Sequence, residues 1–246
     1  PFTTHTELMD ASLFLHGLNY SQKLDQRFGK KTIAAKMTDV PGHTRSIVPL
    51  LVEAGIEFLH IGVNPASTPP DVPPIFIWRH PSGAEVIVMY HKGTYGDLMI
   101  QENLDCGICF AHTGDNQGPP SVKDVLTTYS HLKGLFPEAD IQASTLNAFS
   151  RKLRKIKSTL PVITQEIGDT WIHGVGSDPG KVSRFREFSR LRNRWLIQGT
   201  TAAEQEAIDR FSDRLILIPE HTWGMDEKTH FPDIVHYSTD ELRKVK

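Results

Sequence analysis

The sequence predicts an α/β protein with a mainly parallel sheet, because short apolar runs alternate with longer amphipathic segments. The first two runs, KTIAAKM at 31–37 and EFLHIGV at 57–63, have the length and composition of buried strands. Between them, RSIVPLLVEAG at 45–55 has a helical apolar pattern that ends at Gly55. This order predicts a βαβ unit with two parallel strands, within a single domain that spans 1–246.

The rest of the chain continues the alternation, with one antiparallel exception. Residues 75–91 predict a hairpin, since Pro-Ser-Gly at 81–83 supplies a turn between two β-rich runs. The helix expected at 121–136 has a clear start, because Ser121 follows two prolines. We expect further strands at 106–112, 140–144 and 161–167, and further helices at 146–158, 181–198 and 202–218.

Composition excludes two classes of partner. The chain has 27 basic and 29 acidic residues and a formal net charge of −2, without a long basic run, so we expect no nucleic acid. No apolar run approaches the roughly 18 residues that span a bilayer, so we expect no membrane segment. The only cysteines, Cys106 and Cys109, have C-x-x-C spacing. A zinc site would need a second pair, so we interpret these cysteines as structural.

Polar side chains gather just after the predicted strands, where α/β proteins bind ligands. Asp39 and His43 follow the first strand and Asn64 the second, and later clusters contain His112, Asp115, Asn116, Asp169, His173 and Asp178. Two interpretations of Asp39 are open. It either caps the helix that follows, as Thr44 also could, or it is a catalytic group at the end of a parallel strand. Each of the other residues could equally be ordinary turn chemistry.

A last cluster lies in PEHTWGMDEKTH at 219–230, where His221, Trp223 and Asp226 occur together. A histidine and a carboxylate beside an exposed tryptophan are typical of a sugar or metal site. The alternative is a surface loop in which Trp223 fills the core, because tryptophan is usually well buried.

The order of these motifs resembles the catalytic domain of family 38 glycoside hydrolases, the retaining α-mannosidases. It is still more similar to an uncharacterised branch of related glycosyl-hydrolase-like proteins. The resemblance rests on DVPGHT with LLVEAGIEFLHIGVN, on HTGDNQGPPSVKDVL, on EIGDTWIHG with PGKVSRFREFSR, and on EHTWGMD. It runs through nearly the whole chain in the family's order. Three positions depart from the family pattern, with Pro41 in place of phenylalanine and Gln117 and Pro119 in place of glycines.

The resemblance implies an irregular (β/α)7 barrel, a zinc ion and a covalent glycosyl–enzyme intermediate on a carbohydrate substrate. Asp39 matches the carboxylate that is both nucleophile and zinc ligand, and His221 matches a histidine zinc ligand. Asp169 and Asp178 are the two candidates for the general acid/base. Asp115 matches a position that lines the sugar site. We expect the remaining substrate contacts from Asn64, His112, Asn116, Trp171, His173 and Trp223.

One departure concerns the metal. The family has a His-x-Asp pair on its first strand, and the nearest string in this chain is His5-x-Glu7, which falls after the expected place. Because the chain starts at Pro1 without a methionine, we expect the first strand and two more zinc ligands upstream, and the family's C-terminal β-domains in a longer protein. By itself, the chain is expected to bind zinc weakly or not at all.

Three functions remain open from the sequence. The leading hypothesis is a retaining glycoside hydrolase that acts on an α-linked sugar, in the manner of an α-mannosidase. A metal-dependent carbohydrate deacetylase would also collect aspartate and histidine at strand ends, but would use a metal-activated water. A carbohydrate-binding barrel that has lost its chemistry is the third.

Overall fold

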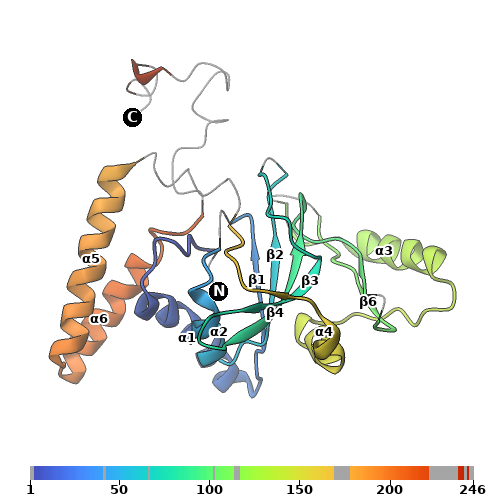
Figure 1. The fold of residues 1–246 in the computed structure, drawn as a ribbon, viewed down its shortest axis with the longest axis horizontal. Coiled ribbons are helices and arrows are strands. Elements are labelled where there is room, and N and C mark those ends of the chain that lie inside the picture. Colours follow the sequence, from blue (N-terminus) through green and yellow to red (C-terminus); the bar gives the residue numbers. More distant parts are fainter. Residues whose placement is uncertain are drawn as a thin grey trace.

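A computed structural model describes residues 3–40, 43–65, 67–101, 103–113, 117–168, 178–221, 238–240 and 243. Its centre is a five-stranded sheet with the order β1-β2-β4-β3-β7 (Figure 1). The strands are β1 (Ala34–Thr38), β2 (Phe58–Gly62), β3 (Ile75–Arg79), β4 (Glu85–His91) and β7 (Val162–Ile163). The pairs β1–β2, β2–β4 and β3–β7 are parallel, and β3–β4 is antiparallel.

The mixed, mostly parallel sheet confirms the predicted α/β class, and the antiparallel β3–β4 pair confirms the predicted hairpin. The closed barrel is not confirmed. Within the described residues the sheet is open, because β1 and β7 each pair on one side only. The hairpin reverses the chain inside the sheet, so a simple repeat of parallel strands and helices does not describe this arrangement.

Helices cover both faces of the sheet. Helices α1 (Ala11–Phe28) and α2 (Ile47–Glu53) lie on one face, where Phe14, Val48 and Leu51 join a core with the sheet residues Val88 and Tyr90. On the other face, α4 (Leu146–Leu153) buries Phe149 and Leu153 against Phe58 and Met89, and a 3-10 helix (Arg154–Thr159) follows it. Alternate residues of each strand therefore face two different cores.

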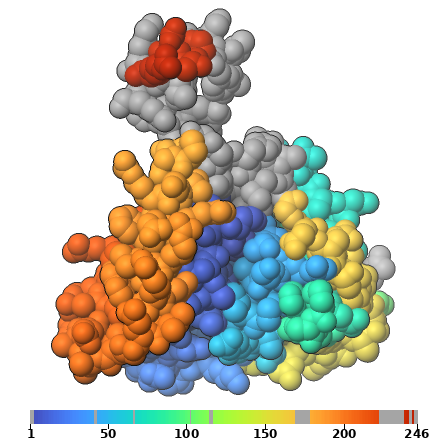
Figure 2. Space-filling model, turned by 60° about the vertical axis from the view of Figure 1, so that its left-hand side comes forward, coloured from blue at the N-terminus to red at the C-terminus, as the bar shows by residue number. Residues whose placement is uncertain are grey.

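Helices α5 (Pro179–Gln198) and α6 (Ala202–Leu215) form an antiparallel pair beside the sheet (Figures 1 and 2). In Figure 2 this pair, in orange, forms a lobe next to the N-terminal segment in blue. The buried Arg192 of α5 ties the lobe to α1, since its guanidinium donates to Ser212 Oγ of α6 at 2.6 Å and to the Ser12 hydroxyl of α1.

The periphery opposite this lobe contains α3 (Val122–Leu135) and a two-stranded ribbon of β5 (Met99–Ile100) and β6 (Gly107–Ile108) (Figure 1). Ser121 caps α3, as the sequence predicts, but α3 has no buried residue. Cys106 directly precedes β6 and Cys109 directly follows it, and both are free thiols. None of the described helices is long and apolar enough to cross a membrane.

Three of the predicted strands differ in the structure, and one helix was not predicted. The strand predicted at 161–167 is reduced to β7, Val162–Ile163. Residues 140–144 are not a strand, because they lie near the surface with no partner strand. The strand predicted at 106–112 is reduced to Gly107–Ile108, which pairs with β5 outside the main sheet. Helix α1 was not predicted, although Asp10 caps its start and Gly29, with φ 60°, ends it. Its buried face is narrow, with only Leu13, Phe14 and Gly17 buried, so its apolar pattern is weak.

Candidate active site

Asp39 stands at the C-terminal end of β1 with an unusual backbone. Its N–H still donates to Gly62 O of β2 at 3.0 Å, which extends the strand pairing by one residue. Its φ is 58°, the one positive φ of a non-glycine residue among the described parts of the chain. Such a conformation costs about 1–2 kcal/mol for most residues, although aspartate tolerates it better than most. Strain of this kind often occurs at functional sites, because the side chain must point in a particular direction.

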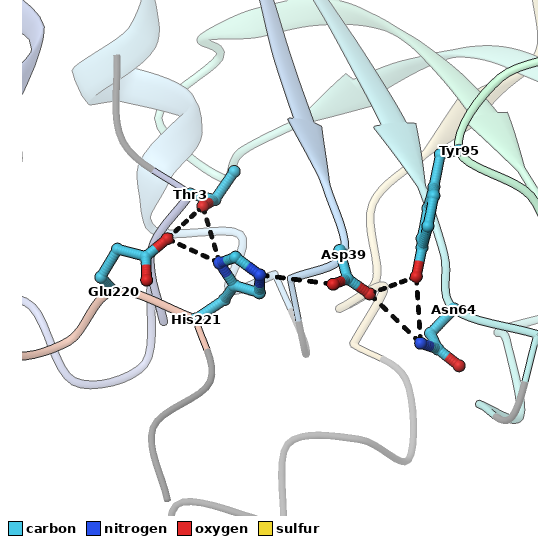
Figure 3. A network of polar contacts seen from close by, with 6 residues as sticks. All are labelled: Thr3, Asp39, Asn64, Tyr95, Glu220 and His221. Carbon is cyan, nitrogen blue, oxygen red and sulfur yellow. Dashed lines mark hydrogen bonds and ion pairs between the residues drawn. The ribbon is translucent and has the colours of Figure 1, made fainter. Parts of the chain in front are cut away.

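One carboxylate oxygen of Asp39 accepts two hydrogen bonds (Figure 3). Tyr95 Oη donates to Asp39 Oδ1 at 2.5 Å, and Asn64 Nδ2 donates to the same oxygen at 3.2 Å. Asn64 Nδ2 also lies 3.1 Å from Tyr95 Oη, so the three groups form a closed triangle. Asn64 follows β2 and Tyr95 follows β4, and β1, β2 and β4 are successive parallel strands of the sheet. The parallel sheet therefore brings these side chains to one edge.

The other oxygen of Asp39 contacts a residue from the far end of the chain. His221 Nε2 lies 3.3 Å from Asp39 Oδ2, and its Nδ1 lies 2.6 Å from Glu220 Oε1 (Figure 3). Thr3 donates its hydroxyl to the same Glu220 oxygen at 2.5 Å. Residues 3–4 and 220–221 run antiparallel to each other, with an isolated β-bridge between Thr4 and Glu220, and His221 N donates to Thr3 O at 2.9 Å. The N-terminal segment thus orients the histidine.

These contacts set the charges of the pair. Burial works to raise the pKa of Asp39, but its three hydrogen-bond donors, His221 first, outweigh burial and hold the pKa below its usual value. The hydrogen bond to Asp39 raises the pKa of His221 to about 9, against the opposing effect of burial and with the help of Glu220. At neutral pH the site therefore contains a carboxylate and an imidazolium, with both ring nitrogens as donors.

The helix-cap interpretation of Asp39 is wrong. Helix α2 begins after Ser46, and no side chain caps it by a hydrogen bond. The carboxylate of Asp39 instead faces Tyr95, Asn64 and His221. His43, four residues further on, is buried, with 1% of its surface exposed.

The structure brings together three of the residues singled out in the sequence, namely Asp39, Asn64 and His221 (Figure 3). His112 is exposed, and its Nε2 lies 3.1 Å from Gly96 O, one residue beyond Tyr95. Asp178 caps α5, because its Oδ1 accepts from Lys181 N at 3.0 Å. Six of the predicted site residues lie outside the described part of the chain: Asp115, Asn116, Asp169, Trp171, His173 and Trp223.

Sequence reasoning missed Tyr95, Glu220 and Thr3. Tyr95 lies between glycines in KGTYGD after a strongly predicted strand, and this position was a usable signal. Glu220 directly precedes His221 and was also accessible as its neighbour. Thr3 carries no signal, because only the tertiary fold brings it to a residue 218 positions away.

The Asp39–His221 pair fits part of a zinc site in which the metal would take the place of the His221 Nε2 proton, because zinc binds the neutral imidazole. Tetrahedral zinc with ligand bonds of about 2.0–2.1 Å holds adjacent ligand atoms about 3.4 Å apart, close to the 3.3 Å between Asp39 Oδ2 and His221 Nε2. Glu220 on the opposite ring nitrogen is the carboxylate partner that zinc-binding histidines commonly have. Among the described residues, however, no group of three or more such side chains is placed to hold a metal.

Comparison with solved structures finds similar folds, among them that of an enzyme. The structure resembles part of an alpha-mannosidase from Enterococcus faecalis V583, with a TM-score of 0.58 and 12% sequence identity over 89% of this chain. This chain spans 29% of the length of that mannosidase. A family model described as a domain of unknown function, DUF5054, matches residues 175–246. No curated protein matches the chain in sequence. At this identity the likeness shows a shared fold and nothing of the activity.

Proposed function

We propose that the chain is the core of a retaining glycoside hydrolase that acts on an α-linked sugar, with Asp39 as the nucleophile. The observation that carries the proposal is the Asp39 carboxylate itself. It stands at the carboxyl end of a parallel strand, on a strained backbone, with three donors directed at its oxygens. The shared fold with an alpha-mannosidase supports the same class of substrate, and membership of family 38 is part of the proposal.

The electrostatics agree with a nucleophile rather than an acid. The pKa of Asp39 is held low, chiefly because its hydrogen bonds overcome burial, so the carboxylate is ionised at neutral pH. In the reaction, an Asp39 oxygen forms a bond to the anomeric carbon while the bond to the leaving-group oxygen breaks. A second carboxylic acid protonates that oxygen. As a base, it then takes a proton from the water that attacks the anomeric carbon and breaks the bond between the sugar and Asp39.

Tyr95 and Asn64 orient the nucleophile in this reaction. Both donate to Asp39 Oδ1, so they fix the plane of the carboxylate before the sugar arrives. His221 contacts the other oxygen and is itself fixed by Glu220. Asp169 and Asp178 stay the candidates for the acid/base. Zinc held by Asp39 and His221 would serve as a template and Lewis acid for sugar hydroxyls.

The decisive experiment is a covalent trap. A 2-deoxy-2-fluoro glycosyl reagent with a good leaving group should label the full-length protein once, and peptide mass spectrometry should place the label on Asp39. Asp39→Asn is the matched control, because asparagine also tolerates the positive φ and should fold without being labelled. A panel of α-linked aryl glycosides, assayed with added zinc, then identifies the sugar.

The same trap separates the alternatives. Release of acetate from N-acetylated sugars without any label on Asp39 would contradict the proposal and favour a metal-dependent deacetylase. Sugar binding without label or turnover across the panel would contradict it in favour of a non-catalytic barrel.

A further inference from the structure

The 94–96 loop, Thr94 to Gly96, places Tyr95 at the edge of the sheet and contacts the strands β1 and β2. Its backbone lies against Gly62 at the end of β2, where a Cβ atom would come within 2.7 Å of Tyr95 Cα and 2.9 Å of Thr94 O. Only glycine allows this approach. The loop therefore rests directly on the β2 backbone, and the Tyr95 side chain extends toward Asp39 (Figure 3).

Lys36 is the charged side chain that fastens this loop. It belongs to β1, three residues before Asp39, and its Nζ donates to Tyr95 O at 3.0 Å. Lys36 as a whole is exposed, yet burial around its ammonium group lowers its pKa to about 8. The group is still mainly charged at neutral pH, and a charged donor makes a stronger hydrogen bond than a neutral one.

Aromatic packing restricts the direction of Lys36. Its Nζ lies 5.6 Å from the ring centroid of Phe110, which stacks on the buried His60 at 4.4 Å. Phe110 also covers Gly96, where a Cβ atom would come within 2.7 Å of the ring. Lys36 and His60 are register partners on β1 and β2, so the two strands present this support together.

Tyr95 thus has contacts at both ends with one short segment, Lys36 within β1 and Asp39 directly after it. Lys36 binds the backbone carbonyl of Tyr95, and Asp39 accepts its hydroxyl. We propose that Lys36 is a positioning residue for the Asp39 carboxylate, acting through the 94–96 loop and Tyr95. The inference rests on the proposed role of Asp39 for its kinetic consequence, while the structural consequence can be measured without any activity.

The structural test follows the Tyr95 hydroxyl by NMR of the full chain with 13Cζ-labelled tyrosine. The chain has five tyrosines, and Tyr95→Phe identifies the resonance of interest by its loss. Lys36→Met should move this resonance toward that of a tyrosine whose hydroxyl faces water, and Lys36→Arg should largely restore it. Lys133→Met is the matched control, because Lys133 Nζ also donates to a backbone carbonyl, Ala139 O at 3.1 Å, but far from Asp39.

The kinetic test compares the rate of covalent labelling of Asp39. Lys36→Met and Tyr95→Phe should each slow labelling roughly tenfold, the usual scale for one hydrogen bond to a charged group. The double variant should be no slower than Tyr95→Phe alone, because both changes break one path. Lys133→Met should label at the wild-type rate.

The outcomes separate the two proposals. An unmoved Tyr95 resonance in folded Lys36→Met, or fully additive rates, would overturn the positioning role. A wild-type protein that shows no labelling while the resonance still moves would reject the glycosidase proposal and retain the role of Lys36 in placing Tyr95. If Lys36→Met does not fold, Lys36→Gln is measured and interpreted in the same way.

Discussion

The backbone of Tyr95 passes so close to Gly62 that any side chain there would collide with it, with Thr38 Cγ2 at 2.8 Å as a second obstacle. The neighbouring atoms are mainly backbone, so they cannot rotate away as a flexible side chain would. A single hydrogen atom in place of a methyl group therefore decides whether Tyr95 reaches Asp39. The site therefore depends on the missing side chain of Gly62 as well as on its polar groups.

Gly62→Ala should accordingly lower the free energy of unfolding by about 1–3 kcal/mol, the usual cost of overpacking, and should weaken the Tyr95–Asp39 contact. Gly134→Ala is the matched control. Gly134 lies in α3, nothing lies within 4 Å of its added Cβ, and alanine there should stabilise by about 0.5–1 kcal/mol. Urea denaturation measures both changes. A Gly62→Ala protein as stable as wild type would show that the loop does not rest on the sheet.

At the scale of elements, two helices begin with the same capping box but have different surroundings. Ser121 and Asp124 exchange hydrogen bonds at the start of α3, and Thr201 and Glu204 do so at the start of α6. Helix α6 buries Ile208, Ser212 and Leu215, whereas α3 buries no residue. Loss of the capping box should therefore affect the stability of the whole protein at α6 but not at α3.

Thr201→Ala should lower the global free energy of unfolding by about 1 kcal/mol, because α6 unfolds with the core that it helps to form. Ser121→Ala should instead speed amide hydrogen exchange in the first turn of α3 and leave the global value nearly unchanged. Urea denaturation and exchange mass spectrometry measure the two effects. An equal global loss in both variants would mean that α3 unfolds together with the core.

At the scale of the whole molecule, several histidines are buried in their neutral form. His43 is 1% exposed and His60 is not exposed, and burial lowers the pKa of His43 to about 4 and that of His60 to about 2. The neighbouring Lys36 and His91 lower the pKa of His60 further. In the unfolded chain a histidine takes up its proton near pH 6.5. Unfolding between these pH values therefore binds protons, and acid favours the unfolded state.

We expect the free energy of unfolding to fall as pH drops from 7 to 5, at up to about 1.4 kcal/mol per pH unit for each such histidine. The loss should begin near pH 6.5 and should end only below the folded pKa of each group. His43→Leu should reduce this slope, because it removes one histidine that binds a proton only on unfolding. Urea denaturation across this pH range measures the slope. An unaltered slope in His43→Leu would show that His43 binds its proton to the same extent in the folded and the unfolded protein.

The sequence predictions succeed where a feature depends on neighbouring residues and fail where it depends on a distant part of the chain. The β3–β4 hairpin, the start of α3 and the placement of Asp39 after β1 were all predicted, because turn residues, caps and apolar runs act between near neighbours. The strand predicted at 140–144 failed, because β structure needs a partner strand, and no local pattern shows whether one is present.

By itself, the sequence determined the α/β class, the parallel β1–β2 pair and the polar residues Asp39 and Asn64 at one edge, because a helix that connects two neighbouring strands makes them parallel. Only the tertiary structure decided that the sheet is open in the described residues, that Tyr95 bends back over Gly62, and that Thr3 and Glu220 hold His221 against Asp39. These contacts join segments more than 30 and up to 218 positions apart, and their free energy depends on packing that no short stretch of sequence contains.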